Sequence, residues 1–149
     1  MQKTVFRSVF MALVICLSAC RQSNTEHTEV EETALEFAQA YFNYDFARAA
    51  EMATADSRKW LEFEASNISQ ADIDLLRRQD SGAEIVVTDT DSNGGNWASA
   101  RLTARNFLVA DTLGKAGHFV EERDFDLKLQ RDSAGRWRVR MEGPLRSGR

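Results

Sequence analysis

Cysteine, histidine and proline are scarce in this sequence of 149 residues, and each scarcity excludes a class of structure or site. Both cysteines, Cys16 and Cys20, lie near the N-terminus, so the rest of the chain can form neither a disulfide framework nor a cysteine metal site. The two histidines, His27 and His118, are far apart and lack H-x-H or H-E-x-x-H spacing, so we expect no metal. The one proline, Pro144, lies near the C-terminus and leaves the first half free to form helices.

Positive charge is also in short supply. The chain has 19 Lys and Arg against 23 Asp and Glu, a formal net charge of −4. An acidic chain lacks the basic surface that nucleic acids and anionic lipid headgroups require, so we expect no nucleic-acid partner. Phosphate-loop, Gly-x-Gly-x-x-Gly and Gly-x-Ser-x-Gly motifs are missing as well, and we expect no cofactor.

The N-terminus has the pattern of an export signal. Lys3 and Arg7 precede an apolar run, residues 8–19, which is too short to span a bilayer but suits a signal's hydrophobic region. The run ends in Leu17-Ser18-Ala19-Cys20, and this order resembles the lipobox of bacterial lipoproteins. An ordinary secretory signal is the alternative, but Leu17 is not the small residue that its peptidase prefers.

The lipoprotein resemblance implies that residues 1–19 are removed and that Cys20 carries a diacylglycerol and a further acyl chain such as palmitate. One acyl chain binds a bilayer only marginally, whereas two or more anchor a protein stably without spanning the membrane. Enteric lipoproteins kept at the inner membrane have aspartate after the cysteine, so Arg21 favours the outer membrane. We therefore predict a lipid-anchored protein of the bacterial cell envelope.

The remaining chain divides into a polar flexible tether (residues 20–29), one domain (30–143) and a polar tail (144–149). Thr28, three residues before Glu31, has capping-box spacing and predicts the start of a first helix. Further helices are predicted after three N-cap positions. These are Asp45, Asp56 or Ser57, and Ser69.

The second half changes to the alternating pattern of strands, which we predict over residues 85–88, 97–109, 119–130 and 137–141. Tight turns separate them, the first around Asn93-Gly94. Helices followed by an antiparallel meander predict an α+β fold, with the helices packed on one face of a curved sheet of about four strands.

The patterns of two stretches of the sequence point to a protein family. Residues 34–50 form an amphipathic helix, a short break and an alanine-rich helix, and residues 127–139 form two strands around a turn that ends in Gly-x-Trp-x-Val. This order resembles the NTF2-like, cystatin-like group, whose members form a cone with a pocket at its open end. Some members are enzymes and many are binding or assembly modules, so the resemblance implies a pocket but does not select a function.

Carboxylates and tyrosines are the residues that enzymes of this fold use in the cone. The acidic candidates are Glu121, which shares a predicted inward strand face with Arg123, and Asp45. Tyr41 and Tyr44, which flank the helix break, and Arg123 are candidates for ligand contacts. The structural alternatives are that Asp45 only caps a helix and that Glu121 and Arg123 form an exposed ion pair.

Three functions fit these features. The first is a non-catalytic envelope lipoprotein that binds a small ligand or a protein partner. The second is a small pocket enzyme of isomerase or hydratase type with an acidic base. The third is a structural component that forms a homodimer through arginines on the outer sheet face, namely Arg101, Arg105, Arg138 and Arg140.

The lipobox gives a direct prediction. Cys20→Ala removes the only thiol at the predicted acylation position, so the variant should leave the membrane fraction for the soluble fraction or remain unprocessed. Cys16→Ala is the matched control, because this cysteine lies inside the predicted signal and should leave detergent-phase partitioning unchanged. Full membrane partitioning of a Cys20→Ala protein from which residues 1–19 have been removed would show that the anchor is not this cysteine.

Overall fold

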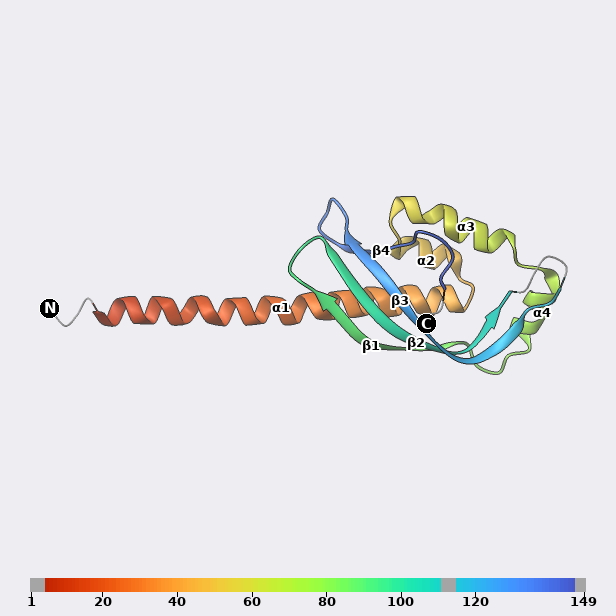
Figure 1. Cartoon of the computed structure of the whole chain (residues 1–149), viewed down its shortest axis with the longest axis horizontal. Coiled ribbons are helices and arrows are strands. Elements are labelled where there is room, and N and C mark those ends of the chain that lie inside the picture. Colours follow the sequence, from red (N-terminus) through yellow and green to blue (C-terminus); the bar gives the residue numbers. More distant parts are fainter. Residues whose placement is uncertain (1–4, 111–114, 147–149) are drawn as a thin grey trace.

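The computed structural model of the protein describes residues 5–110 and 115–146, with side chains from Asn24 onward. Its elements confirm the α+β prediction, with helices packed on a four-stranded antiparallel sheet of order β1-β2-β3-β4 (Figure 1). Their bounds are α1 Val5–Phe42, α2 Phe46–Met52, the 3-10 turn η1 Ala55–Ser57, α3 Arg58–Ser66, α4 Gln70–Arg77, β1 Glu84–Ser92, β2 Trp97–Val109, β3 His118–Arg131 and β4 Trp137–Arg140.

The predicted signal and Cys20 lie outside the residues whose side chains are described, as do residues 147–149 of the predicted tail. A search of the described residues for a helix long and apolar enough to cross a membrane finds none.

Residues 24–29, predicted to belong to a flexible tether, are instead helical within α1. Thr28, predicted as the N-cap, donates its hydroxyl hydrogen to the carbonyl of Asn24 one turn earlier, at 3.0 Å. Two contacts with the sheet hold this polar segment: Glu26 pairs with Arg131 at 2.9 Å, and His27 Nδ1 lies 3.2 Å from the Thr90 hydroxyl. Tertiary contacts therefore override the weak helix preference of the polar sequence.

The core lies between one face of α1 and the concave face of the sheet. Phe37 and Leu102 are fully buried, and fully burying such side chains contributes roughly 1.5–3 kcal/mol each. Three of the four inward residues of β2 before Asn106 are alanines, which let the helix approach the strand closely; they are Ala98, Ala100 and Ala104. The core begins at Val30 and ends at Met141 among the residues with described side chains. A chain of residues 21–149 therefore keeps this core whole.

The residues of β2 that face the core no longer alternate regularly once the strand reaches Asn106. Even-numbered residues up to Ala104 are buried, but beyond Asn106 the buried residues are Phe107 and Leu108. Asn106 has a left-handed backbone, with φ of 52°, which re-aims the strand. Gln79 holds this conformation, because its amide donates to the carbonyl of Asn106 at 2.6 Å. The strand thus bends away from its earlier course where α1 ends.

Helix caps and a cross-link fix the ends of the elements. Asp45 caps α2 by accepting a hydrogen bond from the Arg48 N–H at 3.1 Å, as predicted. Ser69 caps α4 in a capping box with Asp72, which confirms the predicted start of this helix. Ser57 precedes α3 as predicted, but its hydroxyl accepts from the Met141 N–H at 2.7 Å and makes no cap bond.

Asp72 also joins α4 to the end of the β2–β3 connection. Its carboxylate is 1% exposed and accepts hydrogen bonds from Ser69 and, at 2.7 Å, from the Gly117 N–H. A side chain at Gly117 would collide with the backbone carbonyl oxygen of Val109, so glycine is required there. Burial alone would raise the pKa of Asp72, but the hydrogen bonds from Ser69 and Gly117 lower it below 3.8.

Asp72→Ala should therefore lower the free energy of unfolding by about 2 kcal/mol, since the cap and the bond to Gly117 are both lost. Because the folded-state pKa is depressed, this contribution is complete above the ordinary value and is lost as the pH falls through the folded value. Urea unfolding at neutral and acidic pH measures both effects. Asp74→Ala, on the same helix but half-exposed, is the control. Equal losses for the two variants would refute the cross-link.

Candidate functional site

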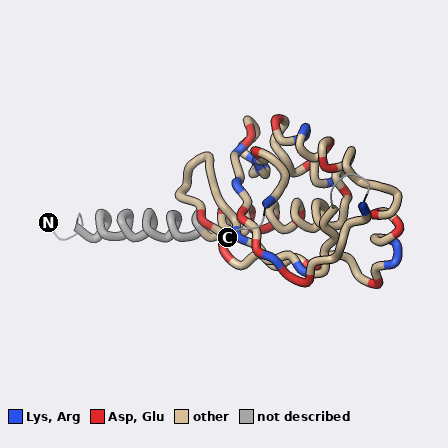
Figure 2. The backbone as a smooth tube through the Cα atoms, turned by 45° about the vertical axis from the view of Figure 1, so that its right-hand side comes forward, with Lys and Arg blue, Asp and Glu red and all other residues tan. Residues whose placement is uncertain are grey.

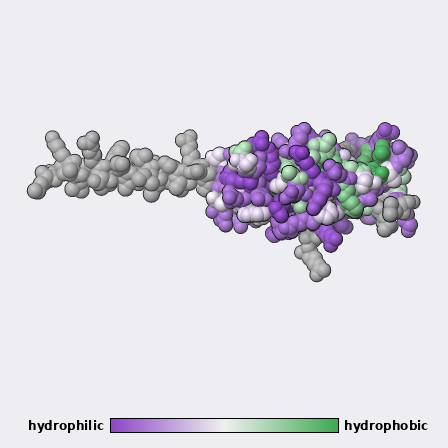
Figure 3. Space-filling view, turned by 90° about the horizontal axis from the view of Figure 1, so that it is seen from above, coloured by the Kyte–Doolittle hydropathy of each residue, from purple (hydrophilic) through white to green (hydrophobic). Residues whose placement is uncertain are grey.

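A cavity of about 560 Å³ opens beside the C-terminal end of α1. It is bounded by the α1–α2 break, by α3, by the ends of β2 and β3 that lie near Asn106, and by the segment after β4. On the face seen in Figure 3, apolar surface gathers at the end of the domain that also holds α4 in Figure 1. The predicted pocket of the cone is therefore present.

Six aromatic residues line one part of the cavity wall. Phe42 lies at the centre, with ring centroids 4.7 Å from Phe125 and 5.0 Å from Phe107. Phe46 packs edge-on against both tyrosines, at 5.6 Å from Tyr41 and 5.5 Å from Tyr44. Edge-to-face contacts of this kind fix the rings and add about 0.5–1.5 kcal/mol per pair beyond burial. The wall is thus rigid and apolar before any ligand enters.

The end of α1 positions the two tyrosines. Tyr44 has a left-handed backbone, with φ of 64°, and the Asp45 N–H donates to the carbonyl of Ala40 at 2.9 Å, the pattern that closes a helix C-terminus. This turn directs the Tyr44 hydroxyl to the carbonyl of Leu108, to which it donates at 2.9 Å. A left-handed tyrosine costs about 1–2 kcal/mol, which the hydrogen bonds and ring contacts offset.

Both tyrosines stay protonated at neutral pH. Burial raises the pKa of Tyr44 to about 12, with further contributions from the charges of Asp72 and Glu64. Burial, followed by the charge of Glu64, raises the pKa of Tyr41 well above its usual range. The Tyr41 hydroxyl oxygen accepts from the Leu145 N–H at 3.3 Å, and no acceptor for its proton is found among the described residues. Tyr41 is therefore a hydrogen-bond donor available in the cavity.

Glu64 is the acidic residue of the cavity wall, and the sequence analysis missed it. It lies on α3 and is half-buried, and its side-chain carboxyl makes no hydrogen bond or ion pair within the described part of the chain. Burial raises the pKa of its carboxyl above the ordinary 4.5. A signal was available, because Glu64 follows Trp60 and Leu61 by one helical turn and so shares their apolar face.

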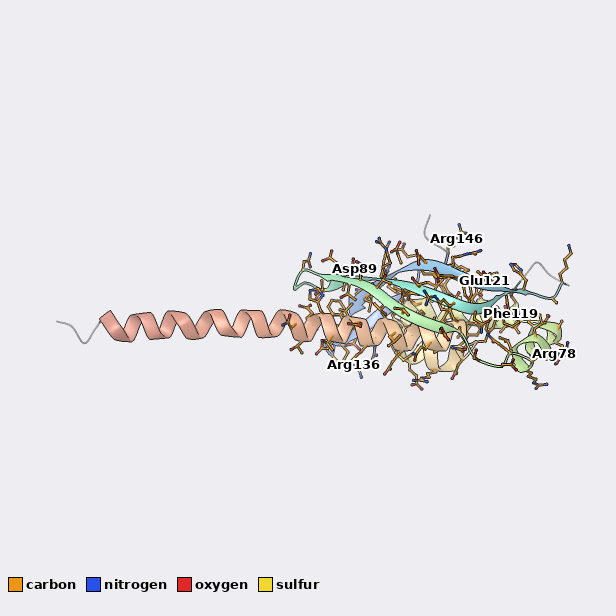
Figure 4. The ribbon with its side chains drawn as sticks, turned by 90° about the horizontal axis from the view of Figure 1, so that it is seen from below. Arg78, Asp89, Phe119, Glu121, Arg136 and Arg146 are labelled. Atoms are coloured by element: carbon orange, nitrogen blue, oxygen red, sulfur yellow. The ribbon has the colours of Figure 1, made fainter. Side chains whose placement is uncertain are left out.

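The other predicted residues separate into two groups. Tyr41, Tyr44 and Arg123 line the cavity, although the Arg123 side chain is exposed. Glu121 and Asp45 do not line it, and both are exposed. Figure 4 marks Glu121 on β3, close to Phe119 and outside the helices.

The prediction that Glu121 faces inward is wrong, because it assumed that inward and outward residues alternate without interruption past the bend at Asn106. Opposite Phe107 the half-buried residue of β3 is Val120, not Glu121. Neither Glu121 nor Asp45 therefore lies in the cavity, where the base of a pocket enzyme would have to act.

The outer-face arginines do not form a free basic cluster. Arg101 pairs with Asp126 at 3.0 Å, Arg105 with Glu122 at 2.5 Å, and Arg138 with Asp132 at 3.3 Å. Arg140 lies over the half-exposed ring of Trp97, at 5.6 Å from its centroid. Figure 2 shows both signs of charge interspersed along the chain. Metal ligands are equally dispersed, since no three His, Cys, Asp or Glu side chains gather within the described residues.

Comparison with solved structures shows an NTF2-like fold. The chain is similar to a ketosteroid isomerase-like protein from Erwinia carotovora atroseptica SCRI1043, with a TM-score of 0.58 and 12% identity over 78% of this chain and 93% of the other. An NTF2-like protein involved in plasmid conjugation aligns with a TM-score of 0.38 and 13% identity, over 82% of this chain and 48% of the other. No protein-family profile matches the sequence, and no curated protein matches it.

Glu64→Gln should stabilise the protein at neutral pH. A raised folded-state pKa means that stability falls as the pH rises from the ordinary 4.5 through the folded value, because the half-buried carboxylate must ionise. Glutamine removes that cost, which solvent screening keeps below about 1 kcal/mol. Thermal unfolding should show a gain at pH 7 that vanishes at about pH 3. Glu62→Gln, exposed on the same helix, is the control, and a pH-independent gain would contradict the assignment.

Proposed function

We propose that this protein is a lipid-anchored lipoprotein of the bacterial envelope whose NTF2-like domain binds a small organic ligand without transforming it. The observation that supports binding is the cavity of about 560 Å³, in which the proton of Tyr41 and the carboxyl of Glu64 lack partners among the described residues. Cavities of this size, apolar with a few polar groups, are typical of small-molecule sites. The sequence Leu17-Ser18-Ala19-Cys20 supports the anchor.

The anchor would place the cavity away from the membrane. Glu26, six residues after Cys20, contacts Arg131 at the end of the sheet near the β3–β4 turn, and six residues reach at most about 22 Å. The cavity lies at the other end of α1, where the helix from Glu26 to Phe42 rises by about 24 Å. A ligand would therefore enter from the aqueous side and not from the bilayer.

One observation favours catalysis as a second candidate. Glu64, with its raised pKa, and the protonated Tyr41 face one apolar cavity, and an acid beside a hydrogen-bond donor suits proton transfer of isomerase or hydratase type. The solved structure of a ketosteroid isomerase-like protein has the same fold. Chemical change of a captured ligand by the wild type but not by Glu64→Gln would favour this candidate over simple binding.

Native mass spectrometry of the mature lipoprotein, extracted with detergent from the cell's own envelope, should show a retained small molecule in addition to the acyl chains. Ala110→Trp fills the cavity rim with a large side chain and should remove that added mass. Ala65→Trp places the same side chain on the exposed side of α3, outside the cavity wall, and should keep the ligand. A wild-type domain that is folded and ligand-free at every purification step, or a mass retained by Ala110→Trp, would contradict the assignment of the cavity.

A further inference from the structure

The cavity also indicates the charge of its ligand. Resting on the proposed function, we propose that the ligand is an amphipathic organic acid, whose apolar body lies on the aromatic wall and whose acid group is bound by Arg123 and Arg146. Both arginines line the cavity, Arg123 from β3 and Arg146 from the segment that follows β4. Figure 4 marks Arg146 beyond the strands.

The arginines of the sheet differ in what their guanidinium groups contact. Arg101, Arg105, Arg131 and Arg138 each hold a carboxylate of their own chain. The guanidinium of Arg123, the sheet arginine that lines the cavity, makes no ion pair or hydrogen bond with any described residue, and the same holds for the guanidinium of Arg146. A guanidinium presents several donors and no acceptor, and carboxylates are its best-matched partners. The cavity therefore presents two cationic groups that the fold itself leaves unused.

The remaining polar groups of the cavity fit an acceptor-rich ligand too. Tyr41 offers a proton, whereas the proton of Tyr44 is already given to the carbonyl of Leu108. Glu64 faces the same cavity, and in its protonated form it is also a donor. Its ionised form opposes a bound anion and would attract a cation. The sign of the ligand charge can therefore be read from the effect of removing the charge of Glu64.

Two fluorescent probes with one aromatic skeleton test the charge directly. N-phenyl-1-naphthylamine is neutral, and 1-anilinonaphthalene-8-sulfonate adds one sulfonate, which stands in for the ligand's acid group. Titrations with residues 21–149 should show that the sulfonate binds about tenfold more tightly than the neutral probe. This factor corresponds to the weaker end of the range for hydrogen bonds to charged groups, because both arginines are exposed. Ala110→Trp should weaken binding of both probes.

Charge variants then assign the effect to residues. Arg123→Gln should remove most of the preference for the sulfonate and leave the neutral probe unchanged, while Arg101→Gln, on the outer face, should change neither. Glu64→Gln should tighten binding of the sulfonate alone. Circular dichroism confirms that each variant is folded.

The outcomes separate this inference from the proposed function. Equal affinity for the two probes, or tighter binding of the neutral one, would overturn the organic acid while leaving a ligand cavity in place. Weaker binding of the sulfonate by Glu64→Gln would likewise overturn it and favour a cationic ligand. Failure of both probes to bind the folded wild type would overturn the cavity as a ligand site and the organic acid with it.

Discussion

The bend of β2 at Asn106 is the constraint on which the cavity depends. Up to Ala104 the strand follows α1 and buries it, because small residues let helix and sheet approach closely. At Asn106 the left-handed backbone, held by Gln79, turns Phe107 inward and carries the sheet past the end of the helix. Phe107 and Phe125 pack on Phe42 at the end of α1, and the same three rings line the cavity.

The outer sheet face and the cavity differ in how their charged and polar groups are paired. On the outer face, pairs such as Arg101 with Asp126 are exposed, and solvent-exposed pairs of this kind contribute little to stability. In the cavity, Glu64 and the proton of Tyr41 lack partners among the described residues, although partly buried polar groups without partners are unfavourable. A fold that satisfies its surface charges but leaves these groups open is typical of a site that a ligand completes.

Much of this fold could be predicted from the sequence because local rules suffice for it. Strand alternation gave the bounds of β2 and β3 to within one residue, and Asp45 and Ser69 cap helices as their positions indicate. The break between the first two helices likewise indicated Tyr41 and Tyr44, and both line the cavity. Glu121 was misplaced because a single left-handed residue, Asn106, reverses the alternation that its assignment assumed. The helical state of residues 24–29 depends on partners in the sheet, which no local pattern contains.

A crystal structure of the mature protein, purified from its own envelope without added ligand, tests the central claim most directly. We expect continuous non-protein density against Phe42 and Phe125, with one end within hydrogen-bond distance of the Arg123 guanidinium. A cavity that holds solvent alone, with Arg123 paired to a carboxylate of its own chain, would contradict it. In that case the open end of the cone would be a consequence of the bend at Asn106 and not a binding site.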